Sequence, residues 1–152
     1  LRDVIDSSVA MLEHVFDKSN INVNVNINEE LIVLGDKNQI RQVIINLLLN
    51  SYEAIIQRQS NDYHGEIDIN GYKNDDEIIV VFLDNGIGMD EKELQKAFEI
   101  FYTTKDKGSG LGLPISRQII ERNNATISIH SRKNEYTKIV LRFQLKERVK
   151  ET

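Results

Sequence analysis

The chain contains no cysteine and no tryptophan, and its 152 residues include one proline. Without cysteine it cannot form disulfides or thiolate metal sites. No apolar run approaches the roughly 18 residues of a membrane-spanning helix, and no signal peptide opens the chain. We therefore expect a soluble, cytoplasmic domain. Because the chain begins with Leu1 rather than methionine, we also expect a fragment of a longer protein, whose parent could be membrane-anchored.

Basic residues are in the minority, and the formal net charge is -5. This balance argues against a nucleic-acid-binding surface but still allows an anionic ligand at a local patch. A hydrophobic content of 40% in 152 residues suits one domain with a single core. Because we find no repeat, low-complexity segment or linker, we assign residues 1–145 to one domain and 146–152 to a charged tail.

Hydrophobic periodicity predicts a chain that mixes helices and strands. Helical spacing covers 1–18, 36–59, 90–98 and 114–124, and Asp36 is the expected N-cap of the second helix. Strand patterns cover 21–27, 31–34, 66–72, 77–83, 125–131 and 136–145. The run at 77–83 is apolar on both faces, so we place it centrally in the sheet.

An acidic residue follows that central run, and two glycines follow it, in Asp84-Asn-Gly-Ile-Gly-Met89. A carboxylate at the end of a buried strand would point into a pocket. Gly86 and Gly88 have no Cβ, so their backbone can approach a ligand closely. Taken alone, these six residues favour an ordinary turn slightly over a binding loop.

The long predicted helix carries a polar stripe beside its core stripe: Gln42, Asn46, Asn50 and Glu53 are spaced by three or four residues. Asparagine is a poor residue for a helix interior because its side chain competes for backbone hydrogen bonds. The stripe by itself fits a solvated face and a binding face equally well.

Residues 98–110 follow neither regular period, as is common for functional lids. They lead into Gly108-Ser-Gly-Leu-Gly-Leu113, which opens a helix with Pro114 in its first turn. Backbone N–H groups and the helix dipole at such a position favour phosphates. The loop is not a Walker A motif, which needs Gly-Lys-Ser/Thr, nor a dinucleotide fingerprint, which directly follows a strand.

Together these segments resemble the N, G1, F and G2 boxes of the catalytic, ATP-binding domain of sensor histidine kinases, in the same order: Asn46 to Asn50, Asp84 to Gly88, Phe98 to Thr104 and Gly108 to Leu113. The resemblance covers residues 1–145 and extends to gyrase B, heat-shock chaperone and mismatch-repair ATPases. It implies an α+β, Bergerat-type fold. That fold is a two-layer α/β sandwich with a mixed sheet of about five strands and helices on one face.

The resemblance also implies roles for individual residues. Asp84 would accept a hydrogen bond from the exocyclic amine of adenine, with Gly86 and Gly88 against the base and sugar. Asn50 would coordinate the Mg²⁺ that bridges the phosphates of ATP, and Asn46 would support this catalytic site. Phe98, Phe101 and Tyr102 would close the lid. The remaining nucleotide contacts would come from Tyr102, Lys105, Lys107, Gly108, Ser109, Gly110, Leu111, Gly112 and Leu113.

The residue at position 46, an asparagine, helps to decide whether the domain transfers phosphate or hydrolyses ATP. Hydrolysing relatives typically place a glutamate there as general base on water, and asparagine cannot take a proton. A neutral histidine substrate needs no such base. We therefore expect transfer of the γ-phosphate of Mg·ATP to a histidine on a separate dimerisation and phosphoacceptor domain. A response-regulator receiver domain would act downstream in two-component signal transduction. The alternatives are a conformational ATPase, a serine-directed anti-sigma-type kinase, and a degenerate domain that only binds.

Several features depart from the family pattern. Ser51 stands where alanine is usual, and Glu53 stands where many kinases carry a phosphate-contacting lysine. Phosphate neutralisation would then fall on the lid lysines. None of the three histidines, at positions 14, 64 and 130, has the sequence context of a phosphoacceptor. We therefore expect the acceptor histidine to lie outside this chain, and the isolated domain to be a monomer.

Overall fold

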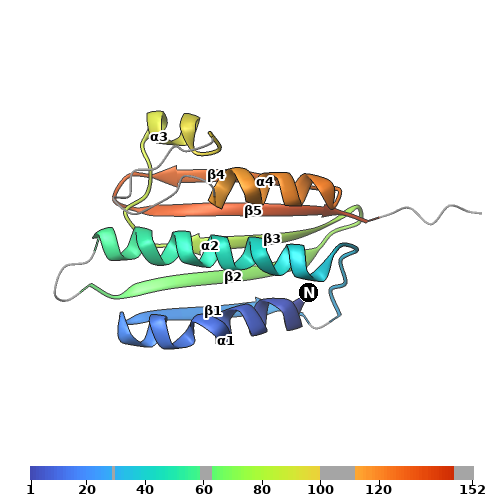
Figure 1. Cartoon of the computed structure of the whole chain (residues 1–152), viewed down its shortest axis with the longest axis horizontal. Helices are drawn as coiled ribbons and strands as arrows, with labels where there is room; N and C mark the ends of the chain where they lie inside the picture. Colours follow the sequence, from blue (N-terminus) through green and yellow to red (C-terminus); the bar gives the residue numbers. More distant parts are fainter. Residues whose placement is uncertain (29, 59–62, 100–111, 146–152) are drawn as a thin grey trace, which may run out of the picture.

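The computed structural model describes residues 1–28, 30–58, 63–99 and 112–145 (Figure 1). Its elements are α1 (Arg2–Lys18), β1 (Ile21–Ile27), α2 (Lys37–Arg58), β2 (Gly65–Lys73), β3 (Glu77–Asp84), α3 (Glu91–Lys96), α4 (Gly112–Arg122), β4 (Ala125–Arg132) and β5 (Tyr136–Gln144). Within these ranges, none of the helices combines the length and apolar character needed to span a membrane. Most of the expected lid, the loop at 108–111 and the tail at 146–152 lie outside the described residues.

Five strands form one mixed sheet in the order β1-β2-β3-β5-β4. β1 and β2 are parallel, and the other neighbouring pairs are antiparallel. The parallel pair needs a crossover connection, and α2 lies within it. β3 occupies the centre of the sheet, as its apolar sequence predicts, and Ile79 is buried even though it lies on the face that no described helix covers. The expected sheet of about five mixed strands is confirmed.

Helices α1, α2 and α4 cover one face of this sheet (Figure 1). The core stripe of α2 follows the spacing that its sequence predicts, and all of its members are buried: Ile40, Val43, Ile44, Leu47 and Leu48. They share one hydrophobic core with alternate residues of the strands, including Ile67, Ile69, Val80 and Leu141. The expected two-layer arrangement, with helices on one face, is therefore confirmed.

Aspartates begin two of the helices as N-caps. Asp36 Oδ1 accepts hydrogen bonds from the backbone N–H groups of Asn38 (2.9 Å) and Gln39 (3.0 Å), which confirms the predicted cap of α2. Asp90 Oδ1 accepts from Glu93 N at 2.8 Å at the start of α3. That backbone hydrogen bond favours the charged carboxylate and lowers the pKa of Asp90 from its ordinary value.

The expected strand at 31–34 is wrong, because these residues form no strand. The prediction rested on a short run of four apolar residues, and the structure does not bury that run throughout: Leu31 is 7% exposed, whereas Ile32 and Leu34 are 72% and 64% exposed. A strand also needs a neighbouring strand for its backbone hydrogen bonds. Leu31 instead uses its N–H in a turn to Asn28 O, and its carbonyl accepts from the N-terminal amine of Leu1. The segment is an irregular connection into α2.

Candidate functional site

Asp84, the last residue of β3, has its carboxylate on the side of the sheet that the helices cover. The residue is 4% exposed. Its Oδ2 accepts a hydrogen bond from Ser51 Oγ of α2 at 2.9 Å, and its Oδ1 accepts from the backbone N–H of Gly86 at 2.9 Å. A buried carboxylate is costly unless it is hydrogen-bonded. These two donors stabilise the charge and fix its orientation.

Ser51 was singled out in the sequence only as a departure from alanine. In the structure it is a direct partner of the Asp84 carboxylate, from the helical position next to Asn50. The pairing joins residues 33 positions apart in the chain. The serine itself was therefore visible in the sequence, but no local pattern indicated its partner.

Helix α2 also brings Asn46 and Asn50 to the start of α4. Asn46 Nδ2 donates to Ser116 Oγ of α4 at 3.4 Å. A Cβ built on Gly112 would lie 3.8 Å from both the oxygen and the nitrogen of the Asn50 amide, so the first turn of α4 faces this side chain. Both asparagines are partly buried. The two asparagines of the polar stripe are therefore turned toward α4, whereas Gln42 of the same stripe is exposed.

Two glycines after Asp84 are required by close packing. Gly88 has a φ of +69°, and a Cβ there would lie 2.1 Å from the carbonyl oxygen of Arg132. A Cβ on Gly86 would lie 2.6 Å from the Cβ of Ala54 in α2. These contacts give a structural reason for both glycines. Their predicted closeness to a base and sugar stays a prediction.

β4, β5 and α4 contribute further residues around this loop. Thr137 of β5, 5% exposed, is the cross-strand partner of Asp84. Ser131 Oγ accepts from Met89 N at 2.8 Å and donates to Tyr136 O at 2.6 Å. Phe98, expected to pack the lid against the domain, lies under the Arg117 guanidinium of α4, whose carbon is 5.3 Å from the ring centroid.

Much of the predicted nucleotide site lies outside the described residues. This applies to Phe101, Tyr102, Lys105, Lys107, Gly108, Ser109, Gly110 and Leu111. Gly112 and Leu113 are described, and they form the first turn of α4. The structure therefore brings together the asparagines of α2, Asp84 with its two glycines, and the N-terminus of α4.

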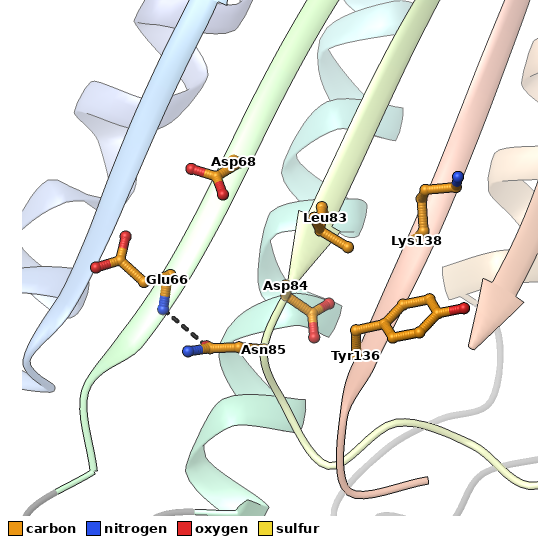
Figure 2. Close-up of a pocket in the computed structure, with 7 residues that line it drawn as sticks. All are labelled: Glu66, Asp68, Leu83, Asp84, Asn85, Tyr136 and Lys138. Atoms are coloured by element: carbon orange, nitrogen blue, oxygen red, sulfur yellow. Dashed lines mark hydrogen bonds between the residues drawn. The ribbon is translucent and has the colours of Figure 1, made fainter. Parts of the chain in front are cut away.

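A separate pocket of about 390 Å³ opens on the face of the sheet that carries no helix in the described part of the chain (Figure 2). Figure 2 views this face with α2 behind the strands. Its lining residues are Glu66, Asp68, Leu83, Asp84, Asn85, Tyr136 and Lys138. Alternation along the strands places Asp68, Leu83 and Lys138 opposite the helix-covered face. This pocket therefore lies mainly on the face opposite the site between β3, α2 and α4, and Asp84 at the end of β3 borders both.

Comparison with curated proteins gives relatives that are much longer than this chain. Sporulation kinase B of Bacillus subtilis (strain 168) is 32% identical over 137 residues, which are 90% of this chain and 31% of the relative. A putative NtrY-like sensor histidine kinase of Rickettsia conorii is 34% identical over 147 residues, 97% of this chain and 23% of the relative. The chain thus spans less than a third of the length of these two relatives.

Solved structures and a family model agree with these relatives. The catalytic domain of histidine kinase ThkA superposes with a TM-score of 0.80 at 31% identity, covering 95% of this chain and 93% of that chain. For the mycobacterial sensor histidine kinase MprB the TM-score is 0.77 at 25% identity, covering 94% and 93%. The family model of histidine kinase-, DNA gyrase B- and HSP90-like ATPases matches residues 35–147. The chain therefore belongs to this ATPase family, as a catalytic domain of the sensor histidine kinase type.

Proposed function

We propose that this domain binds Mg·ATP between α2, the end of β3 and the N-terminus of α4. It then transfers the γ-phosphate to a histidine on a separate dimerisation domain of its parent kinase. The observation that carries this proposal is the convergence of Asp84, Asn50 and Gly112. Asn50 is adjacent in α2 to the serine that binds Asp84, and Gly112 faces its amide.

Asp84 is the proposed reader of adenine. A carboxylate can accept about four hydrogen bonds, so the bonds from Ser51 and Gly86 are compatible with a further one from the exocyclic amine of adenine. Guanine has a carbonyl oxygen at the corresponding position, and the carboxylate would repel it. The buried position would make the hydrogen bond to adenine stronger than it would be in water.

Asn50 and the first turn of α4 are the proposed phosphate and Mg²⁺ region. Among the described residues, no group of three or more His, Cys, Asp or Glu side chains could hold a metal ion. This suits a cation held mainly by phosphate oxygens and water, with one oxygen from Asn50. When bound, Mg²⁺ would neutralise charge on the phosphates. Backbone N–H groups of Gly112 and Leu113 would donate to phosphate oxygens, together with those of 108–111. Lys105 and Lys107 would add positive charge.

Asn46 favours phosphotransfer over hydrolysis in this proposal. Its amide donates to Ser116 Oγ and cannot accept a proton from water. The neutral imidazole of an incoming histidine would attack the γ-phosphorus directly while the bond to the β–γ bridging oxygen breaks and ADP leaves. The domain's part is therefore to position ATP and neutralise its charge. A solved complex of ThkA with a response regulator, 29% identical to this chain with a TM-score of 0.76, supports a receiver domain as the downstream partner.

We expect this chain to phosphorylate a histidine in trans with little release of free phosphate. The assay would mix it with labelled ATP, Mg²⁺ and the dimerisation domain of its parent kinase, with a His→Gln variant of that acceptor as control. Phosphohistidine would be identified as an acid-labile label that the control lacks. Steady phosphate release without a labelled acceptor would favour a conformational ATPase. An acid-stable label would favour a serine-directed kinase.

Gly112→Ala is expected to weaken ATP binding without destabilising the fold. Among the described residues, the added methyl would meet the Asn50 amide, at 3.8 Å, and alanine favours a helix more than glycine does. We therefore expect an unchanged or slightly higher free energy of unfolding. The methyl would occupy the proposed phosphate region, so ATP affinity should fall by about tenfold. Calorimetry and urea unfolding would measure both, with the exposed Gln118→Ala of α4 as control. Unchanged affinity would place the phosphates elsewhere.

A further inference from the structure

Arg58, the last residue of α2, contacts the backbone of two loops at once. Its Nη1 donates to the carbonyl oxygens of Asn85 (3.1 Å), Gly86 (3.2 Å) and Glu135 (3.1 Å). Its guanidinium carbon lies over the ring of Tyr63, 5.0 Å from the centroid. The Tyr63 hydroxyl also donates to the carbonyl of Asn85. We call these five residues the Arg58 clamp.

The clamp differs from the usual role of a basic residue at the end of a helix. Such a side chain ordinarily interacts with the last carbonyls and the dipole of its own helix. Arg58 instead binds carbonyl groups 27, 28 and 77 positions further along the chain. Hydrogen bonds from a charged donor are stronger than neutral ones, and stacking on Tyr63 limits the motion of the guanidinium. The contacts are therefore suited to holding backbone in place.

One peptide unit connects the clamp directly to Asp84. The unit between Asn85 and Gly86 contains the carbonyl that accepts from Arg58 and Tyr63. It also contains the Gly86 N–H that donates to Asp84 Oδ1. Because a peptide unit is planar, its carbonyl and its N–H cannot rotate independently. Fixing the carbonyl therefore fixes the donor that orients the carboxylate.

The clamp also connects this loop to the turn between β4 and β5. Glu135, whose carbonyl Arg58 binds, belongs to that turn. The neighbouring Asn134 donates its N–H to the carbonyl of Ile87 at 2.5 Å. We infer that Arg58 is a positioning residue that holds the Asn85–Gly86 peptide, and through it the Asp84 carboxylate, in the orientation that reads adenine. The nucleotide part of this inference rests on the proposed function.

Hydrogen exchange in the nucleotide-free protein tests the clamp without relying on ATP binding. The N–H groups of Gly86 and Ile87 donate to Asp84 Oδ1 and Ala54 O. In Arg58→Met both should exchange at least about tenfold faster than in the wild type, while core amides of β3 keep their rates. Arg58→Lys keeps the charge but not the planar fork, so its rates should be intermediate. Unchanged rates for Gly86 and Ile87 in Arg58→Met would overturn the inference.

Nucleotide affinity tests the consequence for the site. Arg58→Met should bind ATP about tenfold more weakly and prefer ATP over GTP less strongly, with Arg58→Lys recovering part of both. The matched control is Arg142→Met, which removes an ion pair with Glu77 (2.5 Å) at the opposite end of β3 and should leave both readouts unchanged.

The two readouts distinguish failure of the inference from failure of the proposed function. Wild-type affinity and selectivity in a folded Arg58→Met would overturn the positioning role and leave the proposed function standing. A wild-type chain that binds no ATP would overturn the proposed function and the nucleotide part of the inference. The exchange rates of Gly86 and Ile87 would still decide whether Arg58 holds the loop.

Discussion

Asp84→Asn is expected to lower ATP affinity by about a hundredfold or more and to remove the preference for adenine over guanine nucleotides. In the wild type, Gly86 N–H and Ser51 Oγ both donate to the carboxylate. In the variant, the amide oxygen would keep the bond from Gly86, and the –NH₂ group would replace Oδ2. That group would then face the exocyclic amine of adenine, donor against donor. Loss of a hydrogen bond to a charged acceptor accounts for an effect of this size.

Calorimetric titration with ATP and GTP would measure this effect, and Asp68→Asn is the matched control. Asp68 lies on β2, on the opposite face of the same sheet, and accepts a hydrogen bond from Asn24 Nδ2 at 2.8 Å. The chemical change is identical, but the control should leave ATP affinity unchanged. If both variants bind ATP like the wild type, Asp84 does not read adenine. If both lose binding equally, the effect is a general one of charge or stability.

Gly88→Ala is expected to reduce the free energy of unfolding by about 3 kcal/mol. The residue has a φ of +69°, which costs a side-chain-bearing residue roughly 1–2 kcal/mol. Its new Cβ would lie 2.1 Å from the carbonyl oxygen of Arg132, and relieving such a clash typically costs about 1–3 kcal/mol. The clashing atom belongs to backbone at the end of β4, so it cannot move aside like a flexible side chain.

Urea unfolding at equilibrium would measure the loss, and Gly112→Ala provides the comparison. Both changes add one methyl group, but at Gly112 the nearest atoms in the described part of the chain are 3.8 Å away. A large loss at position 88 with none at position 112 would establish that packing, rather than glycine content, makes the first position sensitive. A loss below about 0.5 kcal/mol for Gly88→Ala would show that the turn next to Arg132 relaxes at little cost.

The sequence predicted those parts of the fold that depend on residues close to one another in the chain. Helix α2 was predicted closely because its core stripe and the cap at Asp36 both lie within the helix or next to it. β3 was predicted to be central because its sequence is apolar on both faces, and the structure places it between β2 and β5. Residues 31–34 are all apolar, yet they formed no strand, and Ile32 and Leu34 are exposed. A short apolar run cannot reveal whether a neighbouring strand is available for pairing, because pairing depends on where the other strands lie.

In the candidate site, too, the sequence revealed the short motifs but not the contacts between residues that are far apart in the chain. Asp84, Asn50 and the glycine-rich segment stand out in the sequence because each motif is a few residues long. No such signal linked Ser51 to Asp84 or Arg58 to the loop after β3, because these partners are 33 and 27 positions apart. Gly88 was predicted as a ligand-approach position. The structure gives it a packing reason, in contact with backbone 44 positions later.

The sequence by itself determined the order and type of most elements, the N-cap of α2 and the identity of the candidate site residues. These depend on periodicity and on interactions within about one helical turn or one strand. The tertiary structure alone decided how the Asp84 carboxylate is oriented, which face of the sheet carries the second pocket and what holds the loop after β3. Those features arise where α2, β3 and the β4–β5 turn meet, and segments far apart in the chain meet only through packing of the whole core.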